Sequence, residues 1–309
     1  MSITKNTDIV KSLAQKVGFD LVGITSPEIP KTDQYKYTNW LSNGFAANMG
    51  YLHRNIDLRT NPENLFNGVK SILVLGLSYY PADKPKLPYK ISKYAYGRDY
   101  HKLIKSRGKL LQKELRAFFP DLKSRIFVDS APVMERSLAV QAGFGWIGKN
   151  TCLINRKKGS FLFLASLFLN IELNADSPFV NSFCGNCTKC IDACPTNALS
   201  EAGLDANRCI SYHTIETQES IPNEILQNMD NQLFGCDICQ DVCPWNQKLS
   251  AHTEPDFFPG NHLILLNEPE LENMSQEDFR TQFAGTPFLR TGKAKLLQTI
   301  KQHLQYNTK

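Results

Sequence analysis

The sequence predicts an α/β or α+β domain with an inserted segment of the bacterial two-[4Fe-4S] ferredoxin type. Segments with strand-like and helix-like apolar spacing alternate over residues 1–175, which indicates a mixed fold. Eight of the nine cysteines fall between positions 184 and 243, in two related runs. With 309 residues, of which 42% are hydrophobic, the chain can bury a sizeable core. We expect three parts: residues 1–175, the cluster segment 176–248, and a C-terminal helical segment 249–309 that packs on the core.

The spacing of apolar residues places helices and strands along the chain. Apolar positions recur at helical spacing over residues 8–17 and over residues 99–118, where they form one stripe of a long helix. Residues 71–80 and 160–169 are apolar runs of strand length. We further expect strands at 20–25 and 125–130, short helices broken at Gly44, Gly50 and Pro62, and helices at 133–143, 275–283 and 293–304.

The cysteine runs carry the strongest signal. The first run, CGNCTKCIDACP at 184–195, has the spacing that gives three thiolates to one [4Fe-4S] cluster and the fourth to another. The second run repeats its last three cysteines, with Leu233 at the missing first position, so we expect Cys209 to substitute. We therefore assign one cluster to Cys184, Cys187, Cys190 and Cys243, and the other to Cys194, Cys209, Cys236 and Cys239.

Two other interpretations of the cysteines fit the sequence less well. Structural zinc usually takes separated C-x-x-C pairs, which leaves the third cysteine and the crossing fourth unexplained. A disulfide framework suits short secreted chains, whereas this chain begins without a basic and then apolar signal peptide. No apolar run reaches the roughly 18 residues needed to span a bilayer. We expect a cytoplasmic protein.

The charge is unevenly distributed. Residues 84–125 carry thirteen Lys or Arg against three acids, whereas residues 171–231 carry two bases against nine acids. The first stretch could attract a polyanion, although the lysines of a solvated helix would give the same count.

The densest group of candidate catalytic residues lies at 128–151. Asp129 is expected at the end of a strand, where open sheets place functional groups, or it could cap the helix that follows. Arg136 could be functional or an ordinary surface arginine, and Lys149 could bind phosphate or be solvated. We expect the glycines at 143, 145 and 148 to leave room for a flat ligand close to the backbone.

Four segments, VDSAPVMERSLAVQAGFGWIGKNT (128–151), KYAYGRDYH (93–101), CISYHTIE (209–216) and GCDICQDVCPWN (235–246), together resemble the epoxyqueuosine reductases. The resemblance runs from near residue 49 to near residue 297. It implies a cobalamin-binding domain, two [4Fe-4S] clusters, and reduction of the epoxide of epoxyqueuosine at the tRNA wobble position to give queuosine. It also implies a cobalamin that reacts as Co(I) and a low-potential electron donor such as ferredoxin or flavodoxin. We expect a monomer.

The resemblance also suggests roles for individual residues. Asp129 would be the proton donor, Arg136 would line the substrate pocket, and His101, Lys149 and Asn150 would lie near the corrin or the modified base. The D-x-H-x-x-G signature of other cobalamin proteins is incomplete, because Ile104 stands where it has glycine. That departure fits a family whose cobalt has no histidine below it. Residues expected to hold the phosphates of the anticodon loop are Lys102, Lys105, Arg107, Lys109, Lys113 and Arg116.

Many members of this family carry a C-terminal helical-repeat domain, and this sequence stops about where it would begin, so tRNA affinity is the property most affected. Two rival functions share some of the features. A reductive dehalogenase would share the cofactors but would have no use for the basic stretch. An electron-transfer protein would leave Asp129 and its surroundings unexplained.

Overall fold

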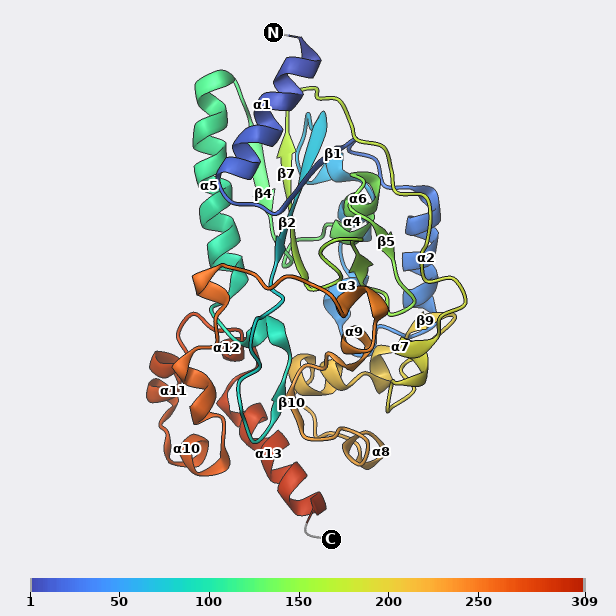
Figure 1. Cartoon of the computed structure of the whole chain (residues 1–309). Helices are drawn as coiled ribbons and strands as arrows, with labels where there is room; N and C mark the ends of the chain where they lie inside the picture. The colour runs from blue at the N-terminus through green and yellow to red at the C-terminus, as the bar shows by residue number, and fades with distance from the viewer. Residues whose placement is uncertain (1, 308–309) are drawn as a thin grey trace. The chain divides into compact units, whose positions relative to one another are not determined.

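The computed structural model describes residues 2–307, and the chain folds as two compact units (Figure 1). Unit 1 consists of residues 1–44, 50–78 and 100–186, and unit 2 consists of residues 45–49, 79–99 and 187–309. Each unit is assembled from segments far apart in the sequence. The three contiguous parts expected from the sequence, with boundaries after residues 175 and 248, stay a prediction.

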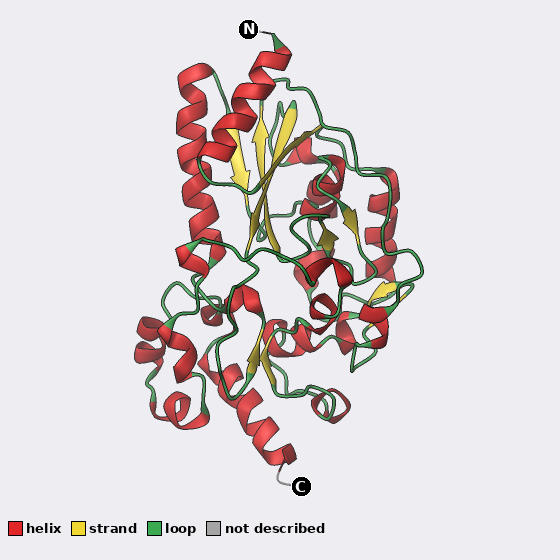
Figure 2. Ribbon diagram, viewed as in Figure 1, coloured by secondary structure: helices red, strands yellow, loops and turns green. Residues whose placement is uncertain are grey.

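Unit 1 is built on a four-stranded antiparallel sheet with strand order β1-β2-β7-β4 (Figure 2). The strands are β1 (Leu21–Thr25), β2 (Ser71–Ser78), β7 (Leu162–Leu169) and β4 (Ser124–Phe127). The two central strands pair over their whole length, from Ser71 opposite Leu169 to Ser78 opposite Leu162. Every residue of β2 is buried, which explains its unbroken apolar run. All four strands were predicted, and their antiparallel pairing makes this unit α+β.

Helices cover both faces of this sheet. Figure 1 shows α1 (Ile3–Lys16) and α5 (Tyr100–Phe118) on one side and α6 (Glu135–Gln141) on the other. The approach of α5 to β4 depends on Gly108, because a Cβ there would lie 2.9 Å from Cγ1 of Ile126. The remaining α-helices and strands of unit 1 are α2 (Lys31–Ser42), α3 (Gly50–His53), α4 (Ile56–Thr60), and the short strands β5 (Trp146–Ile147) and β6 (Leu153–Ile154).

Unit 2 contains most of the cysteine segment and the C-terminal helices. Its helices are α7 (Lys189–Asp192), α8 (Asn223–Leu226), α9 (Ile238–Asp241), α10 (Glu268–Asn273), α11 (Gln276–Gln282), α12 (Phe288–Thr291) and α13 (Lys293–Asn307). Two small sheets pair β3 (Lys90–Ile91) with β10 (Gln232–Phe234), and β8 (Leu199–Ser200) with β9 (Gly203–Leu204).

One hydrophobic core joins these pieces of unit 2. It packs Phe234 of β10 with Phe279, Phe283 and Phe288 of the C-terminal helices, all almost completely buried. Leu233 belongs to the same core and is 0% exposed. Leu233, which stands where the second cysteine run lacks a cysteine, is therefore a core residue. Within residues 2–307, no helix is both long enough and apolar enough to cross a membrane.

Candidate active site and cluster ligands

Asp129 lies on the loop between β4 and α6 and has a left-handed backbone, with φ of 50°. Aspartate is one of the few residues other than glycine that adopt this conformation at modest cost. Its N–H donates to Oε1 of Glu135 at 3.0 Å. The N-cap of α6 is Met134, so the alternative prediction that Asp129 caps the helix is wrong. The Asp129 side chain is 45% exposed.

His101, in the first turn of α5, meets Asp129 across 28 residues of sequence. Its Nε2 lies 3.3 Å from Oδ2 of Asp129, and its side chain is 24% exposed. The His101 ring stacks on Tyr100 at a centroid distance of 4.2 Å, and Tyr100 stacks on Phe163 of β7 at 4.0 Å. The stack fixes the imidazole beside the carboxylate, so two residues predicted for the site lie together.

Glu135 and Arg136 occupy the first turn of α6 and each bonds to a different loop. The pKa of Glu135 is raised to about 8, mainly by burial and also by the Asp129 charge, while the Asp129 N–H, His101 and Arg136 oppose the rise. The carboxyl therefore keeps its proton at neutral pH. Arg136 donates to the carbonyl oxygen of Thr151, a second non-glycine residue with a left-handed backbone, at φ 62°. Glu135 was not among the site residues predicted from the sequence.

The glycine turn does not have the role expected of it. A Cβ at Gly145 would lie 1.9 Å from the carbonyl oxygen of Ile154 in β6, and one at Gly148 would lie 2.5 Å from Cδ1 of the same residue. A Cβ at Gly143 would lie 2.9 Å from the carbonyl oxygen of Ser177. The chain itself fills the space beside all three glycines, so the expected room for a flat ligand there is wrong.

The two polar residues after this turn differ in burial. Asn150 is 3% exposed, and its Oδ1 accepts the N–H of Cys152 at 3.2 Å. Its side chain therefore shapes the turn. Lys149 is half-buried. Their contacts with a corrin or a modified base stay predictions.

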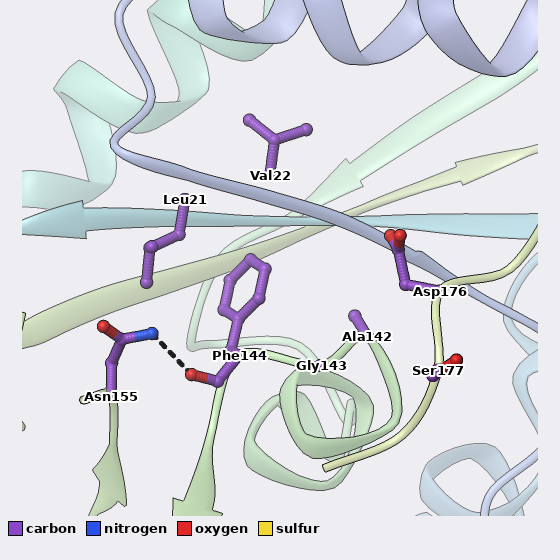
Figure 3. Close-up of a pocket in the computed structure, with 8 residues that line it drawn as sticks. All are labelled: Leu21, Val22, Ala142, Gly143, Phe144, Asn155, Asp176 and Ser177. Carbon is purple, nitrogen blue, oxygen red and sulfur yellow. Dashed lines mark hydrogen bonds between the residues drawn. The ribbon is translucent and has the colours of Figure 1, made fainter. Parts of the chain in front are cut away.

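A surface pocket of unit 1 is lined by Gly143 of the glycine turn but by none of Asp129, His101, Arg136, Lys149 and Asn150 (Figure 3). Its polar groups already have partners within the fold: the Asn155 side-chain amide donates to the Phe144 carbonyl oxygen, and Asp176 pairs with Lys11 and accepts the Ile24 N–H at 2.7 Å. The residues that line the pocket are Leu21, Val22, Ala142, Gly143, Phe144, Asn155, Asp176 and Ser177. We assign it no part in the chemistry.

Three cysteines of the second assigned cluster lie close together in unit 2. The pKa of the Cys236 thiol is raised to about 12, mainly by burial, with contributions from the nearby Cys209 and Cys194. Burial likewise raises the pKa of Cys209, with a contribution from Cys194. The Ala198 N–H points to Sγ of Cys194 at 3.3 Å, which favours the thiolate. Three of the four thiols assigned to this cluster are thus mutual neighbours.

Cys184, which is assigned to the first cluster, belongs to unit 1, and its sulfur has a hydrogen-bond donor there. The indole N–H of the buried Trp146 points to Sγ of Cys184 at 3.4 Å. Trp146 also packs against Phe179 and Phe183, with ring centroids 5.7 and 5.3 Å away. This sulfur therefore has a donor that stabilises its charged form.

The donor set fits two iron-sulfur clusters. All eight cysteines are thiols, and thiolate is the ligand that [4Fe-4S] clusters take. Among residues 2–307, no group of three or more His, Cys, Asp or Glu side chains is arranged to hold a single metal ion. A [4Fe-4S] cluster needs a wider arrangement, because iron and sulfide atoms separate its thiolates.

A buried ion pair supports the second cysteine run. Lys93 is 4% exposed, and its Nζ lies 3.3 Å from Oδ2 of Asp237 and 2.5 Å from Oδ1 of Asp241. The Lys93 N–H also donates to Oδ2 of Asp237 at 2.7 Å. Asp237 directly follows the predicted ligand Cys236, so these bonds hold the ligand loop against the 93–95 turn.

Two models of known protein families match parts of this chain. The model described as "4Fe-4S double cluster binding domain" matches residues 183–246, and the model "Epoxyqueuosine reductase QueG, DUF1730" matches residues 59–130. The epoxyqueuosine reductase of Leadbetterella byssophila is 47% identical over 292 residues, covering 94% of this chain and 96% of the relative. That of Escherichia coli K12 is 39% identical over 300 residues, covering 94% and 78%.

Solved structures agree with these relatives. An epoxyqueuosine reductase bound to an epoxyqueuosine-modified tRNA-Tyr stem loop superposes with a TM-score of 0.90 at 29% identity, covering 98% of this chain and 82% of that one. The Bacillus subtilis enzyme, with an aspartate-bearing catalytic loop swung out of its active site, gives 0.89 at 28% identity and the same coverages. The recognition made from the motifs and the prediction of a mixed fold with a double-cluster domain are confirmed. This chain belongs to the epoxyqueuosine reductase family.

Proposed function

We propose that the protein is an epoxyqueuosine reductase, which converts epoxyqueuosine in tRNA into queuosine. One observation supports the proposal most strongly. The same chain contains a double-cluster domain and, separately from it, a group of titratable residues formed by Asp129, His101 and Glu135. Reducing an epoxide to an alkene breaks both C–O bonds, forms the C=C bond and consumes two electrons and two protons, with the oxygen leaving as water. The chain provides groups that can supply the electrons and groups that can supply the protons.

The cluster cysteines carry the electron side of the reaction. One cluster would be held by Cys184, Cys187, Cys190 and Cys243, and the other by Cys194, Cys209, Cys236 and Cys239. Iron-sulfur clusters of this kind pass single electrons at low potential. The reductant would be a small electron carrier of the ferredoxin or flavodoxin class.

Cobalamin, when bound, supplies a strongly nucleophilic low-potential cobalt centre. The side chains of His101 and Asp129 are 24% and 45% exposed, so both would be able to contact such a group when it is bound in unit 1. We assign His101, Lys149 and Asn150 to the surroundings of the corrin or the modified base, with Asn150 acting through the shape of its turn. Arg136 would line the substrate pocket.

Asp129 is the group we assign to protonate the epoxide oxygen. Its carboxylate is partly exposed, so a substrate can reach it, and His101 lies within hydrogen-bond distance. General acids placed in this way contribute about 10²–10⁴-fold to a rate. The loop setting also supports the role, since the catalytic loop of the Bacillus subtilis relative likewise carries an aspartate.

The exposed basic face of α5 is the part we assign to tRNA phosphates. Lys102, Lys105, Lys109, Lys113 and Arg116 are exposed along this helix. Arg107 is partly committed to the fold, because its Nη1 donates to the Gly18 carbonyl oxygen at 2.8 Å. A flipped base can then enter the site while lysines hold the backbone.

The test is anaerobic reconstitution with iron, sulfide and cobalamin, followed by incubation of the reduced protein with epoxyqueuosine-containing tRNA. Mass spectrometry of the digested nucleosides should detect queuosine, and sedimentation should give a monomer. Protein with about eight irons per chain, as two four-iron clusters require, that neither binds cobalamin nor converts the nucleoside would be an electron carrier only.

A further inference from the structure

We propose that Glu135 is the second acid of this site, which stores a proton and passes it to Asp129 for delivery to the epoxide oxygen. The inference rests on the proposed function. It assigns a catalytic task to a residue that neither the motif nor the family resemblance singled out.

A hydrogen bond ties the carboxyl group of Glu135 to the backbone of Asp129. Oε1 of Glu135 accepts the Asp129 N–H at 3.0 Å, which leaves Oε2 to carry a proton. The Glu135 side chain comes from the first turn of α6 and reaches back to the loop that ends β4. Asp129 in turn lies 3.3 Å from His101 Nε2, through Oδ2. Three titratable groups from three elements thus meet at one point of unit 1.

The charges that face Glu135 explain why it stores a proton. Its neighbours are Asp129 on the loop, His101 on α5 and Arg136 on α6. Burial and the Asp129 charge raise its pKa to about 8, against the opposing effect of the two bases and the Asp129 N–H. Two carboxyl groups this closely coupled do not both ionise readily. At neutral pH the pair therefore retains a proton, and it resides on Glu135.

The reaction consumes protons, and Glu135 can supply them. The epoxide oxygen must gain two protons to leave as water, while the reduced clusters supply two electrons. At rest the pair holds one proton, on Glu135, and Asp129 is a carboxylate. Glu135 passes this proton to Asp129, which delivers it to the epoxide oxygen, and solvent then reprotonates Glu135. The same relay delivers the second proton, so two protons drawn from solvent accompany the two electrons.

A purely structural role for Glu135 makes a different prediction. If its carboxyl only held Asp129 in the left-handed conformation, an amide at the same position would serve equally well, because its oxygen also accepts the Asp129 N–H. Glu135→Gln therefore separates proton storage from positioning. Glu135→Leu removes both the proton and the hydrogen-bond acceptor. Glu172→Gln makes the same change at an exposed acid of the same unit and serves as the matched control.

The experiment measures single-turnover rates against pH with the reconstituted variants. The wild-type rate should be highest below pH 8 and fall as the pH rises through about 8, where Glu135 loses its proton. Glu135→Gln should bind iron and cobalamin normally, react about 100-fold more slowly, and lack this alkaline limb. Glu172→Gln should behave as wild type. A Glu135→Gln enzyme with the wild-type rate and limb, even if Glu135→Leu were inactive, would overturn the proposal.

Infrared spectroscopy gives a second reading that does not depend on turnover. Wild-type protein should show a protonated carboxyl band that disappears near pH 8 and is absent from Glu135→Gln. A missing band would refute the stored proton even in an active enzyme. Conversely, an inactive wild type that shows the band would refute the proposed function while leaving Glu135 identified as a protonated acid.

Discussion

Replacing Lys93 by methionine should destabilise unit 2 and loosen the loop that carries Cys236 and Cys239. The methionine keeps most of the side-chain volume but removes the charge that faces Asp237, a side chain only 9% exposed. Breaking a buried ion pair by removing one partner costs about 3–5 kcal/mol, because the other charge stays buried. We expect about 3 kcal/mol, near the lower end of that range, since the Lys93 N–H still donates to Asp237.

The bond to Asp241 adds little to this estimate. Asp241 is 41% exposed, and exposed partners contribute about 0–1 kcal/mol. A matched control lies three residues earlier, where Lys90 pairs with Asp230 at side-chain exposures of 54% and 67%. Lys90→Met should change stability by no more than about 0.5 kcal/mol. Both variants remove one positive charge by the same substitution.

The assay compares anaerobic urea unfolding, followed by circular dichroism, with the iron content of the reconstituted variants. Lys93→Met should unfold at clearly lower urea and retain less than the full iron complement, whereas Lys90→Met should match wild type. The double variant Lys93→Met/Asp237→Asn should recover part of the loss, because no buried charge is then left without its partner. Equal midpoints for Lys93→Met and Lys90→Met would show that this pair does not support the cluster loop.

Three further predictions follow from the site and the fold. Asp129→Asn should bind iron and cobalamin as wild type does and lose about 10²–10⁴-fold in single-turnover rate; a wild-type rate would exclude Asp129 as the proton donor. Gly145→Ala should yield little folded protein, since its Cβ would lie 1.9 Å from a carbonyl oxygen, whereas Gly50→Ala, with no atom within 4 Å, should fold normally; equal thermal midpoints would contradict the packing argument. Lys105→Gln/Lys109→Gln should weaken tRNA binding and reduce its salt dependence by a slope of about one to two, as measured by filter binding over a salt series; an unchanged slope would remove α5 from the tRNA contact.

Features whose signal is local could be predicted from the sequence. The spacing of the cysteines identified the double-cluster domain, because three ligands of each run lie within a few residues of one another. The central strands were predicted because β2 and β7 are continuous apolar runs. Their order and antiparallel pairing depend on contacts between residues far apart in the sequence, such as Ser71 with Leu169, 98 positions later. No local pattern reveals such contacts.

The errors have the same physical origin. A glycine in the sequence shows that a side chain is missing, but it does not show which atoms fill the space where the Cβ would be. At Gly145 that space is filled by the chain's own strand β6. Charge counts have a similar weakness. Lys93 was counted in the basic stretch, yet it is 4% exposed and neutralised by two aspartates. Glu135 was not predicted because its importance comes from burial and from the Asp129 N–H, both products of the fold.

The first turn of α6 explains how the site holds two unusual loop residues in place. Asp129 and Thr151 both adopt left-handed backbones, each at a cost of order 1 kcal/mol or more. Glu135 bonds to the first and Arg136 to the second, and a hydrogen bond of this kind returns about 0.5–1.5 kcal/mol. Cost and gain are therefore similar for each loop.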